Sequence, residues 1–412
     1  MKTYMFPGQG SQARGMGGDL FDEFPELTAK ADKLLGYSIK ELCLEDPRRE
    51  LNNTQFTQPA LYVVNALSYY KRIQDTGETP DYLAGHSLGE FNALLAAECF
   101  SFETGLKLVK KRGELMSAAT EGAMAAIVNA SREQVEDVLK ENGLSHVDIA
   151  NHNTPQQIVI SGPTADIAAC QEIFQFDRVM YVPLNTSGAF HSRLMMPARQ
   201  KFEAFLKKRK FSKPKIPVIA NLTAKPYPNA AVVEYLSKQI SSTVQWSDTI
   251  HYLMSLSDAM EFVEIGHGNV LAKMILKIKQ IAAQEVAEQA PQAPAPAQAE
   301  EKPETRNVRA VDAVAPTSAS AANDAGNARG ESNDSARTDR FALAEQKVAA
   351  WNRRHPVGTR VKSLVEHGAL VTRTPAVLLF GHRAAVYMEG FNGYFDLDEL
   401  SLDDSLDQQS AA

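Results

Sequence analysis

The segment Tyr82-Leu83-Ala84-Gly85-His86-Ser87-Leu88-Gly89-Glu90 joins an apolar, strand-like stretch to a helix-forming one through a tight turn with Ser87 at its tip. Gly85 and Gly89 leave room for a strained backbone on either side of the serine. The apolar, alanine-rich run 91–100 predicts a helix, whose N-terminal amides favour developing negative charge. We interpret the segment as a nucleophile elbow in an α/β fold. A chance match to the short pattern G-x-S-x-G is the alternative, and the strand before and the helix after argue against it.

A serine hydroxyl is a poor nucleophile until a base takes its proton. Of the nine histidines, His191 is the best candidate, because its loop (185–192) directly follows the predicted strand 179–182. Loops just beyond strand ends are where a scaffold presents chemistry. A surface or structural histidine is the alternative. His86 adjoins the serine, but we expect its side chain to point away from the tip of the elbow.

Arg112 lies in the middle of an apolar stripe on a predicted helix, formed by Leu108, Val109, Leu115 and Met116. A guanidinium that faces a core is costly unless an anion meets it. The position therefore predicts a bound carboxylate. A structural ion pair with a buried Asp or Glu is the alternative.

The composition excludes several classes of protein. A formal net charge of −7 over 412 residues argues against a nucleic-acid partner. Cys43, Cys99 and Cys170 have unrelated spacings, which predict neither a disulfide framework nor a metal site and fit a reducing compartment. The chain lacks a basic start followed by an apolar core, and no run is long enough to span a bilayer. We expect a cytoplasmic enzyme without a metal or a membrane partner.

Strand and helix signals alternate through residues 1–280 in the manner of an α/β core. An insert at about 124–183 has the β-α-β-β-α-β order of a ferredoxin-like lobe, with strands at 124–128, 147–150, 157–161 and 178–182 and helices at 131–141 and 164–174. Ser131 and Gln134 predict a capping box at the first of these helices. Because Ser87 and Arg112 precede the insert and His191 follows it, we expect the catalytic pocket between the two lobes.

The C-terminal third changes composition. Residues 281–340 are rich in Ala, Pro, Gln, Glu, Ser and Asn with almost no aromatic residue, which predicts a disordered linker. Residues 341–402 regain short apolar runs between turns and predict a small SH3-like β-barrel, followed by a tail at 403–412. We hypothesise that this tethered module docks a synthase or a carrier protein. A stable appendage without a recruiting role is the alternative.

Several separated motifs stand in a fixed order along the first 280 residues: Phe6-Pro7-Gly8-Gln9-Gly10-Ser11-Gln12, Gln55-Phe56-Thr57-Gln58-Pro59-Ala60, Gly85-His86-Ser87-Leu88-Gly89-Glu90, Lys111-Arg112-Gly113, Gly188-Ala189-Phe190-His191-Ser192 and Val263-Glu264-Ile265-Gly266. Through them the chain resembles the malonyl-CoA:acyl carrier protein transacylases. Among these it resembles the free-standing acyltransferases that act in trans on polyketide synthases. The resemblance implies a large α/β-hydrolase-like lobe with a central parallel sheet.

The resemblance also implies roles for individual residues. Ser87 would be the acylated nucleophile, His191 its base, and the backbone N–H groups of Gln9 and Leu88 the oxyanion hole, each donor being worth about 3 kcal/mol of barrier. A phosphate-binding role for the glycine-rich loop around Gln9 is disfavoured, because the lysine of a P-loop is missing. In the family a main-chain carbonyl, not a carboxylate, orients the histidine. The matching segment here is 242–246, and we assign this carbonyl to Ser242.

The substrate follows from the same resemblance. Arg112 would hold the free carboxylate of malonate as a bidentate pair. Phe190 would crowd the place of an α-methyl branch, although simple packing of an aromatic is the alternative. Gln58 and Asn153 are expected near the pocket, with ordinary loop scaffolding as the alternative.

The resemblance implies malonyl-CoA as acyl donor, the phosphopantetheine thiol of an acyl carrier protein as acceptor, and no permanently bound cofactor, in polyketide or fatty acid biosynthesis. A thioester hydrolase of the same fold would lack the arginine. A non-catalytic scaffold that binds carrier proteins would have lost Ser87 or His191. All three residues are present.

Overall fold

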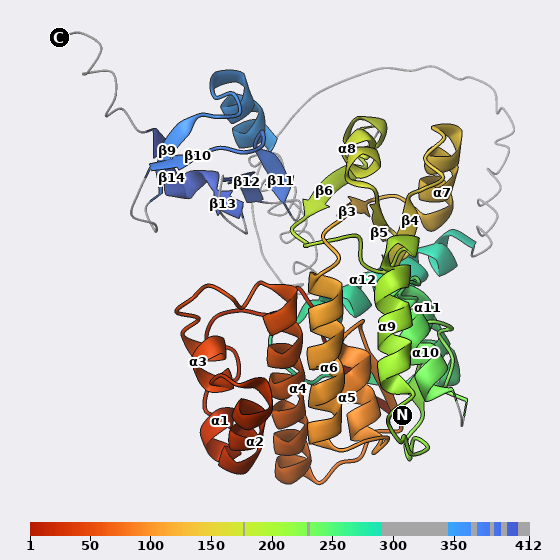
Figure 1. Ribbon diagram of the computed structural model, residues 1–412. Coiled ribbons are helices and arrows are strands. Elements are labelled where there is room, and N and C mark those ends of the chain that lie inside the picture. Colours follow the sequence, from red (N-terminus) through yellow and green to blue (C-terminus); the bar gives the residue numbers. More distant parts are fainter. Residues whose placement is uncertain are drawn as a thin grey trace, which may run out of the picture. The chain divides into compact units, whose positions relative to one another are not determined.

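The computed structural model describes residues 1–175, 178–228, 231–289, 345–363, 369–379, 383–388 and 394–402 (Figure 1). The chain divides into two compact units, Met1–Pro294 and Ala295–Ala412. Within the described helices, none is long and apolar enough to cross a membrane.

The large lobe of the first unit is built on a four-stranded parallel sheet in the order β7 (Val218–Ile219), β2 (Tyr82–Gly85), β1 (Lys2–Phe6), β8 (Glu261–Glu264). Both faces of this sheet are covered. Tyr4 and Phe6 pack into one hydrophobic core and Met5, between them, into another, as alternation along a strand requires. The central parallel sheet that the sequence predicts is therefore present.

Helices surround this sheet (Figure 1), with bounds α1 (Leu20–Glu23), α2 (Pro25–Leu35), α3 (Ile39–Leu44), α4 (Thr54–Thr76), α5 (Gly89–Ala96), α6 (Phe102–Ser117), α9 (Met196–Leu206), α10 (Val232–Gln239), α11 (Trp246–Leu256) and α12 (Val270–Gln289). A short 3-10 turn, Arg193–Met195, precedes α9. The helix predicted for 91–100 ends earlier, at Ala96. The reason is that Glu98 adopts a left-handed conformation with φ of 59°, which a helix does not continue through.

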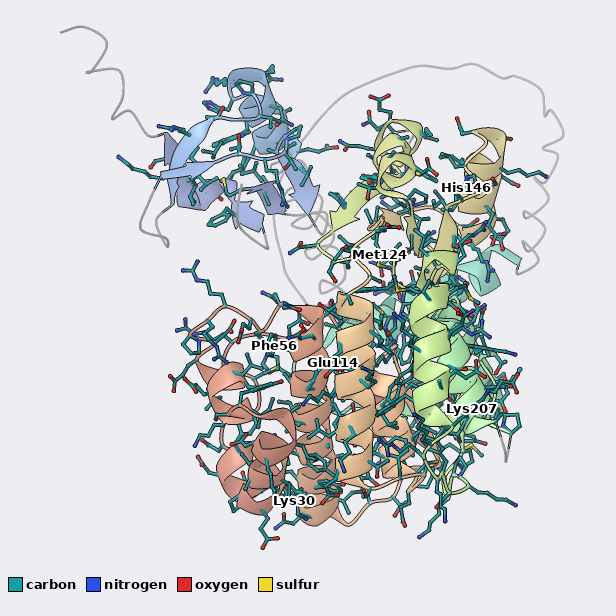
Figure 2. All side chains as sticks on the ribbon, in the orientation of Figure 1. Lys30, Phe56, Glu114, Met124, His146 and Lys207 are labelled. Carbon is teal, nitrogen blue, oxygen red and sulfur yellow. The ribbon has the colours of Figure 1, made fainter. Side chains whose placement is uncertain are left out.

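The small lobe is the insert that the sequence predicts. It consists of β3 (Ala123–Val128), α7 (Arg132–Glu141), β4 (Asp148–Thr154), β5 (Gln157–Gly162), α8 (Thr164–Ile173) and β6 (Met180–Leu184). The strands pair antiparallel in the order β4-β5-β3-β6, and Ser131 with Gln134 forms the predicted capping box. Met124, in β3, lies at the base of this lobe, where it meets the large lobe (Figure 2).

Two further boundaries differ from the prediction by more than two residues. Strand β4 continues past residue 150 to Thr154, because register shifts in its pairing with β5 accommodate the polar run Asn151–Asn153 within the strand. Helix α12 extends to Gln289, so the predicted linker start at 281 falls inside a helix, where Ile281 is buried. The rest of the predicted linker, from 290, and the tail at 403–412 lie outside the described residues.

The second unit contains a helix at 345–354 and short antiparallel strands. One three-stranded sheet has the order β10 (Ala369–Val371), β9 (Arg360–Ser363), β14 (Leu400–Leu402), and the other the order β11 (Val377–Leu379), β12 (Arg383–Tyr387), β13 (Tyr394–Asp396). A small core that includes Val361, Leu370, Val386 and Met388 joins them. The described part of this unit is therefore rich in short strands, as the apolar runs between turns predict. The SH3-like barrel stays a prediction.

Candidate active site

Ser87 sits at a backbone position that only a tightly packed turn enforces. Its φ is 50°, in the left-handed region, and the turn lies between the end of β2 and the start of α5. A Cβ on Gly85 would lie 2.0 Å from the carbonyl carbon of Gly89, and a Cβ on Gly89 would lie 1.9 Å from the carbonyl oxygen of Phe6. Glycine is therefore required on both sides, and the strained serine matches the nucleophile elbow.

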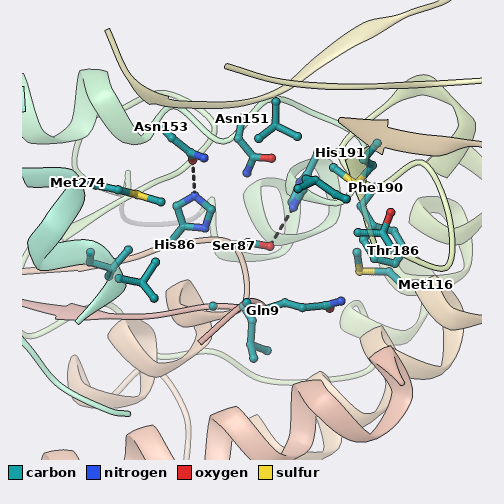
Figure 3. Close-up of a pocket in the computed structure, with 18 of the residues that line it drawn as sticks. Gln9, His86, Ser87, Met116, Asn151, Asn153, Thr186, Phe190, His191 and Met274 are labelled. Carbon is teal, nitrogen blue, oxygen red and sulfur yellow. Dashed lines mark hydrogen bonds between the residues drawn. The ribbon is translucent and has the colours of Figure 1, made fainter. Parts of the chain in front are cut away.

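His191 is hydrogen-bonded to the serine. Its Nε2 lies 2.8 Å from Ser87 Oγ (Figure 3). Its Nδ1 lies 2.9 Å from the carbonyl oxygen of Gln239. Because a carbonyl only accepts, Nδ1 carries the proton and Nε2 is free to take one from the serine. The orienting contact is thus made mainly by Gln239. The predicted residue, Ser242, contributes a weaker backbone interaction with the same ring.

The environment keeps the imidazole neutral. Burial, and after it the nearby charge of Arg112, lowers the pKa of His191 to about 3. A hydrogen bond to the Gln239 carbonyl favours the protonated form and opposes this shift only in part. At neutral pH His191 is available as a base.

Arg112 reaches the same point from α6. The residue is 1% exposed, and its Nη2 donates to Ser87 Oγ at 3.1 Å and to Gln239 Oε1 at 2.9 Å. Its Nε has no hydrogen-bond partner, and no ion pair joins it to an Asp or Glu in the described part of the chain. Burial lowers the pKa of Arg112 to about 10. The alternative of a direct structural ion pair is therefore not found, and the guanidinium keeps unused donors.

Two backbone amides lie beside Ser87. Among the described residues, neither the N–H of Gln9 nor that of Leu88 donates to a protein acceptor, and both residues line the same cavity as Ser87. A Cβ on Gly8 would lie 2.3 Å from the carbonyl oxygen of His86, so the Gln9 loop approaches the elbow backbone to backbone. The arrangement suits two free donors, and their role as an oxyanion hole remains a prediction.

A cavity of about 250 Å³ opens onto Ser87 and is lined from both lobes. The large lobe supplies the elbow, the Gln9 loop, Arg112, Met116 and the first turns of α12; the small lobe supplies Met124, Asn151, Asn153, Val159 and Leu184; Thr186, Phe190 and His191 lie between them (Figure 3). The pocket lies where the sequence places it, between the lobes. No group of three His, Cys, Asp or Glu side chains in the described residues could hold a metal ion.

The other predicted residues take different places. Phe190 and Asn153 line the cavity, whereas Gln58 lies behind it and donates to the sulfur of Met116 at 3.3 Å. His86 also lines the cavity, with Nε2 2.8 Å from Asn153 Oδ1, so it turns toward the small lobe and not toward the Ser87 hydroxyl. Its side chain thus points away from the tip of the elbow, as expected from the sequence.

A polar network beneath the elbow was not predicted. Asn221 accepts from the backbone N–H of Ser87 at 2.7 Å and donates to the carbonyl of Gly85 at 2.6 Å, which ties the turn together. Gln239 donates to the carbonyl of Ser87 at 2.8 Å and to the carboxylate of Glu90. The one signal in the sequence was Glu90, a charged residue at the start of an otherwise apolar helix.

Comparisons with known proteins agree with this geometry. Residues 3–319 match the acyl transferase domain family. The polyketide biosynthesis malonyl CoA-acyl carrier protein transacylase PksC of Bacillus subtilis is 57% identical over 284 residues, which are 68% of this chain and 98% of that protein. BaeC of Bacillus velezensis, which bears the same description, is 56% identical over 68% of this chain and 97% of its own length.

Solved structures give the same result. The crystal structure of a malonyl CoA-acyl carrier protein transacylase from Burkholderia pseudomallei has 61% sequence identity and a TM-score of 0.67, and the match covers 68% of this chain and 98% of that one. A malonyl-transacylase solved in complex with a type II polyketide synthase acyl carrier protein has 33% identity and a TM-score of 0.64, over 68% and 93% of the two chains. On the strength of its elbow, its Ser87–His191 pair and these matches, the chain belongs to the acyl transferase domain family.

Proposed function

We propose that this protein transfers a malonyl group from malonyl-CoA, through an ester on Ser87, to the phosphopantetheine thiol of an acyl carrier protein. One observation carries the proposal. The hydroxyl of Ser87 is in contact with both Nη2 of Arg112, at 3.1 Å, and Nε2 of His191, the proposed base, at 2.8 Å. One cavity thus holds a nucleophile, its base and a buried cation without a carboxylate partner. That combination suits an acyl group with a second, anionic end.

The first half-reaction acylates the enzyme. Ser87 Oγ attacks the thioester carbonyl while its proton passes to His191 Nε2, 2.8 Å away. The negative charge that develops on the carbonyl oxygen is stabilised by the free N–H groups of Gln9 and Leu88. The carbon–sulfur bond then breaks, and coenzyme A leaves with the proton that His191 returns.

The second half-reaction runs the same steps with a new thiol. The phosphopantetheine thiol gives its proton to His191 and attacks the seryl ester, and Ser87 Oγ leaves and recovers the proton. Water must be kept from the ester between the two steps. The apolar side chains of Met116, Met124 and Phe190 around the cavity favour this.

Arg112 and Phe190 set the preference for the acyl group in this proposal. The buried, unpaired Nε of Arg112 provides a donor for the malonyl carboxylate. Phe190, buried beside His191, limits the space for a branched acyl chain. Asn153 orients His86 at the far wall, and Gln58 supports Met116.

The relatives favour a role in polyketide biosynthesis in trans. PksC and BaeC are described as polyketide biosynthesis enzymes, and this chain covers almost their whole length. A thioester hydrolase of the same fold is the second candidate, because it needs the same Ser87 and His191. It has no use for Arg112, which disfavours it.

Intact-protein mass spectrometry after mixing with malonyl-CoA tests the proposal. We expect a malonyl adduct on the wild type that an acyl carrier protein removes, and no adduct on Ser87→Ala. Arg112→Ala should discriminate poorly between malonyl and acetyl donors. Rapid loss of the adduct to water without any acceptor would instead support the hydrolase.

The C-terminal module is proposed to dock the synthase or carrier protein. Its test is removal of everything after Gln289, and not after Gln280, because a cut at 280 would remove the buried Ile281 and the end of α12. We expect a lower kcat/KM for the cognate carrier with unchanged acylation by malonyl-CoA. Equal efficiency with and without the module would remove the docking idea.

A further inference from the structure

A buried carboxylate beneath the nucleophile has no part in the reaction described above. Glu90, in the first turn of α5, is 1% exposed. It accepts hydrogen bonds from the hydroxyl of Tyr227 at 2.5 Å, from the backbone N–H of Asn221 at 3.2 Å, and from Nε2 of Gln239. Three converging donors match the acceptor-only character of an ionised carboxylate.

Gln239 separates this carboxylate from Arg112. Its Oε1 accepts from Arg112 Nη2 at 2.9 Å, while its Nε2 donates to Glu90. Each charge acts on the other through the amide: Glu90 raises the pKa of Arg112, and Arg112 lowers that of Glu90. Burial has the larger effect on both groups, and it brings the pKa of Glu90 to about 7.

The spacing matters for an arginine that has to bind a substrate. A buried guanidinium keeps its proton at neutral pH, but its burial costs stability unless an anion nearby offsets the lost hydration. A carboxylate in direct contact would satisfy it and at the same time fill the donors that the substrate requires. With an amide in between, the compensating charge is present and Nε of Arg112 stays without a partner.

We propose that Glu90 is the counter-charge and positioning residue of Arg112, held one amide away by Gln239. The carboxylate keeps the Gln239 amide in a single orientation, which aims Arg112 at Ser87 and leaves its other donors open. Because the backbone carbonyl of Gln239 also holds His191, the same residue aligns base and cation. This inference rests on the proposed role of Arg112 in binding a malonyl carboxylate.

Glu90→Gln in the full-length enzyme tests it, with kcat/KM measured for malonyl-CoA and for acetyl-CoA. The variant keeps the shape of the side chain and removes its charge. An amide also cannot accept at all three contacts, since one of its two ends is a donor. We expect the malonyl-over-acetyl preference to fall about tenfold or more, the scale of one hydrogen bond to a charged group. Glu98→Gln, an exposed glutamate paired with Lys215, is the matched control and should keep the preference.

The double variant E90Q/Q239E, which exchanges the carboxylate and the amide, distinguishes a role of Glu90 in positioning Arg112 from a role only in the stability of the fold. It restores a donor and an acceptor between residues 90 and 239 and keeps the cluster's total charge, but it puts the carboxylate directly on Arg112 Nη2. We expect thermal stability above that of E90Q and a malonyl preference that stays low. The swap also removes the hydrogen bond that Gln239 Nε2 donates to the carbonyl of Ser87. Because this loss would slow the reactions of malonyl-CoA and acetyl-CoA alike, the ratio of their kcat/KM values can still be interpreted.

Two results would overturn the inference. The first is an unchanged malonyl-over-acetyl preference in E90Q. The second is a swap variant in which both the thermal stability and the malonyl-over-acetyl preference return to the wild-type values. A purely structural Glu90 predicts the second result. Failure of the proposed function looks different, since the wild type itself would then show no malonyl preference, or Arg112→Ala would retain it.

Discussion

Acylation of Ser87 should persist in mild acid, where an ordinary histidine has stopped working as a base. The perturbation is a shift from pH 7.5 to pH 5 in the presence of malonyl-CoA alone. Burial and the charge of Arg112 hold the pKa of His191 at about 3, so the imidazole remains neutral across this range.

The two cases differ by a measurable factor. A histidine with the ordinary pKa of about 6.5 would be roughly 3% neutral at pH 5, and the rate would fall about thirtyfold. With a pKa of about 3, or even a unit higher, more than about nine-tenths of His191 remains neutral at pH 5. In Glu90→Gln, which lacks a carboxylate that titrates in the same range, the first-turnover rate should therefore change by less than about twofold, and any larger fall in the wild type would come from protonation of Glu90.

Rapid-quench measurement of coenzyme A release in the first turnover isolates this step from carrier binding. Glu90, close to Arg112, also titrates in this range, because burial raises its pKa to about 7. Repeating the profile with Glu90→Gln separates the two contributions. A rate that drops tenfold for each pH unit below 6.5 in both proteins would refute the argument that His191 is kept neutral.

Three further outcomes follow from the structure. Gly89→Ala should give little folded enzyme in thermal unfolding, since its Cβ would lie 1.9 Å from the Phe6 carbonyl, an overlap that costs about 3 kcal/mol or more. Ser131→Ala should cost about 1 kcal/mol in urea unfolding through loss of its cap and leave acylation unchanged, because residue 131 is not in the cavity. The wild type should lose about 2 kcal/mol between pH 7 and pH 5 from His191 alone, since a pKa depressed in the folded state gives stability above 6.5 that is lost as pH falls. His191→Gln should remove that loss, and an equally steep fall in the variant would contradict it.

The candidate nucleophile and the candidate cation could be predicted from the sequence because each breaks a local pattern, and the candidate base because its loop directly follows a predicted strand. Ser87 stands between glycines that only a strained turn explains, and Arg112 interrupts an apolar stripe. No comparable feature of the sequence identifies the backbone carbonyl that contacts His191. A main-chain acceptor can belong to any residue type, and the assignment to Ser242 missed Gln239, which lies at the end of α10.

The remaining differences have a common cause in tertiary context. Asn153 lies in strand β4 because bulges absorb a polar run that a strict alternation would exclude. The predicted start of the linker falls inside α12, because a composition rich in alanine and glutamate is compatible with both a helix and a disordered linker. Asn221 and Tyr227 join the site only through long-range contacts, so nothing near them in the chain pointed to it.

The groups of the site come from widely separated parts of the polypeptide: His191 follows Ser87 by 104 positions, and Gln239 follows His191 by a further 48. A nascent polypeptide that has emerged only as far as the small lobe contains Ser87 but lacks His191, Gln239 and the Asn221 contacts that tie the turn together. It cannot consume acyl thioesters. Reactivity is thereby postponed until synthesis of this unit is nearly finished, and proteolytic fragments broken within the insert would be inert.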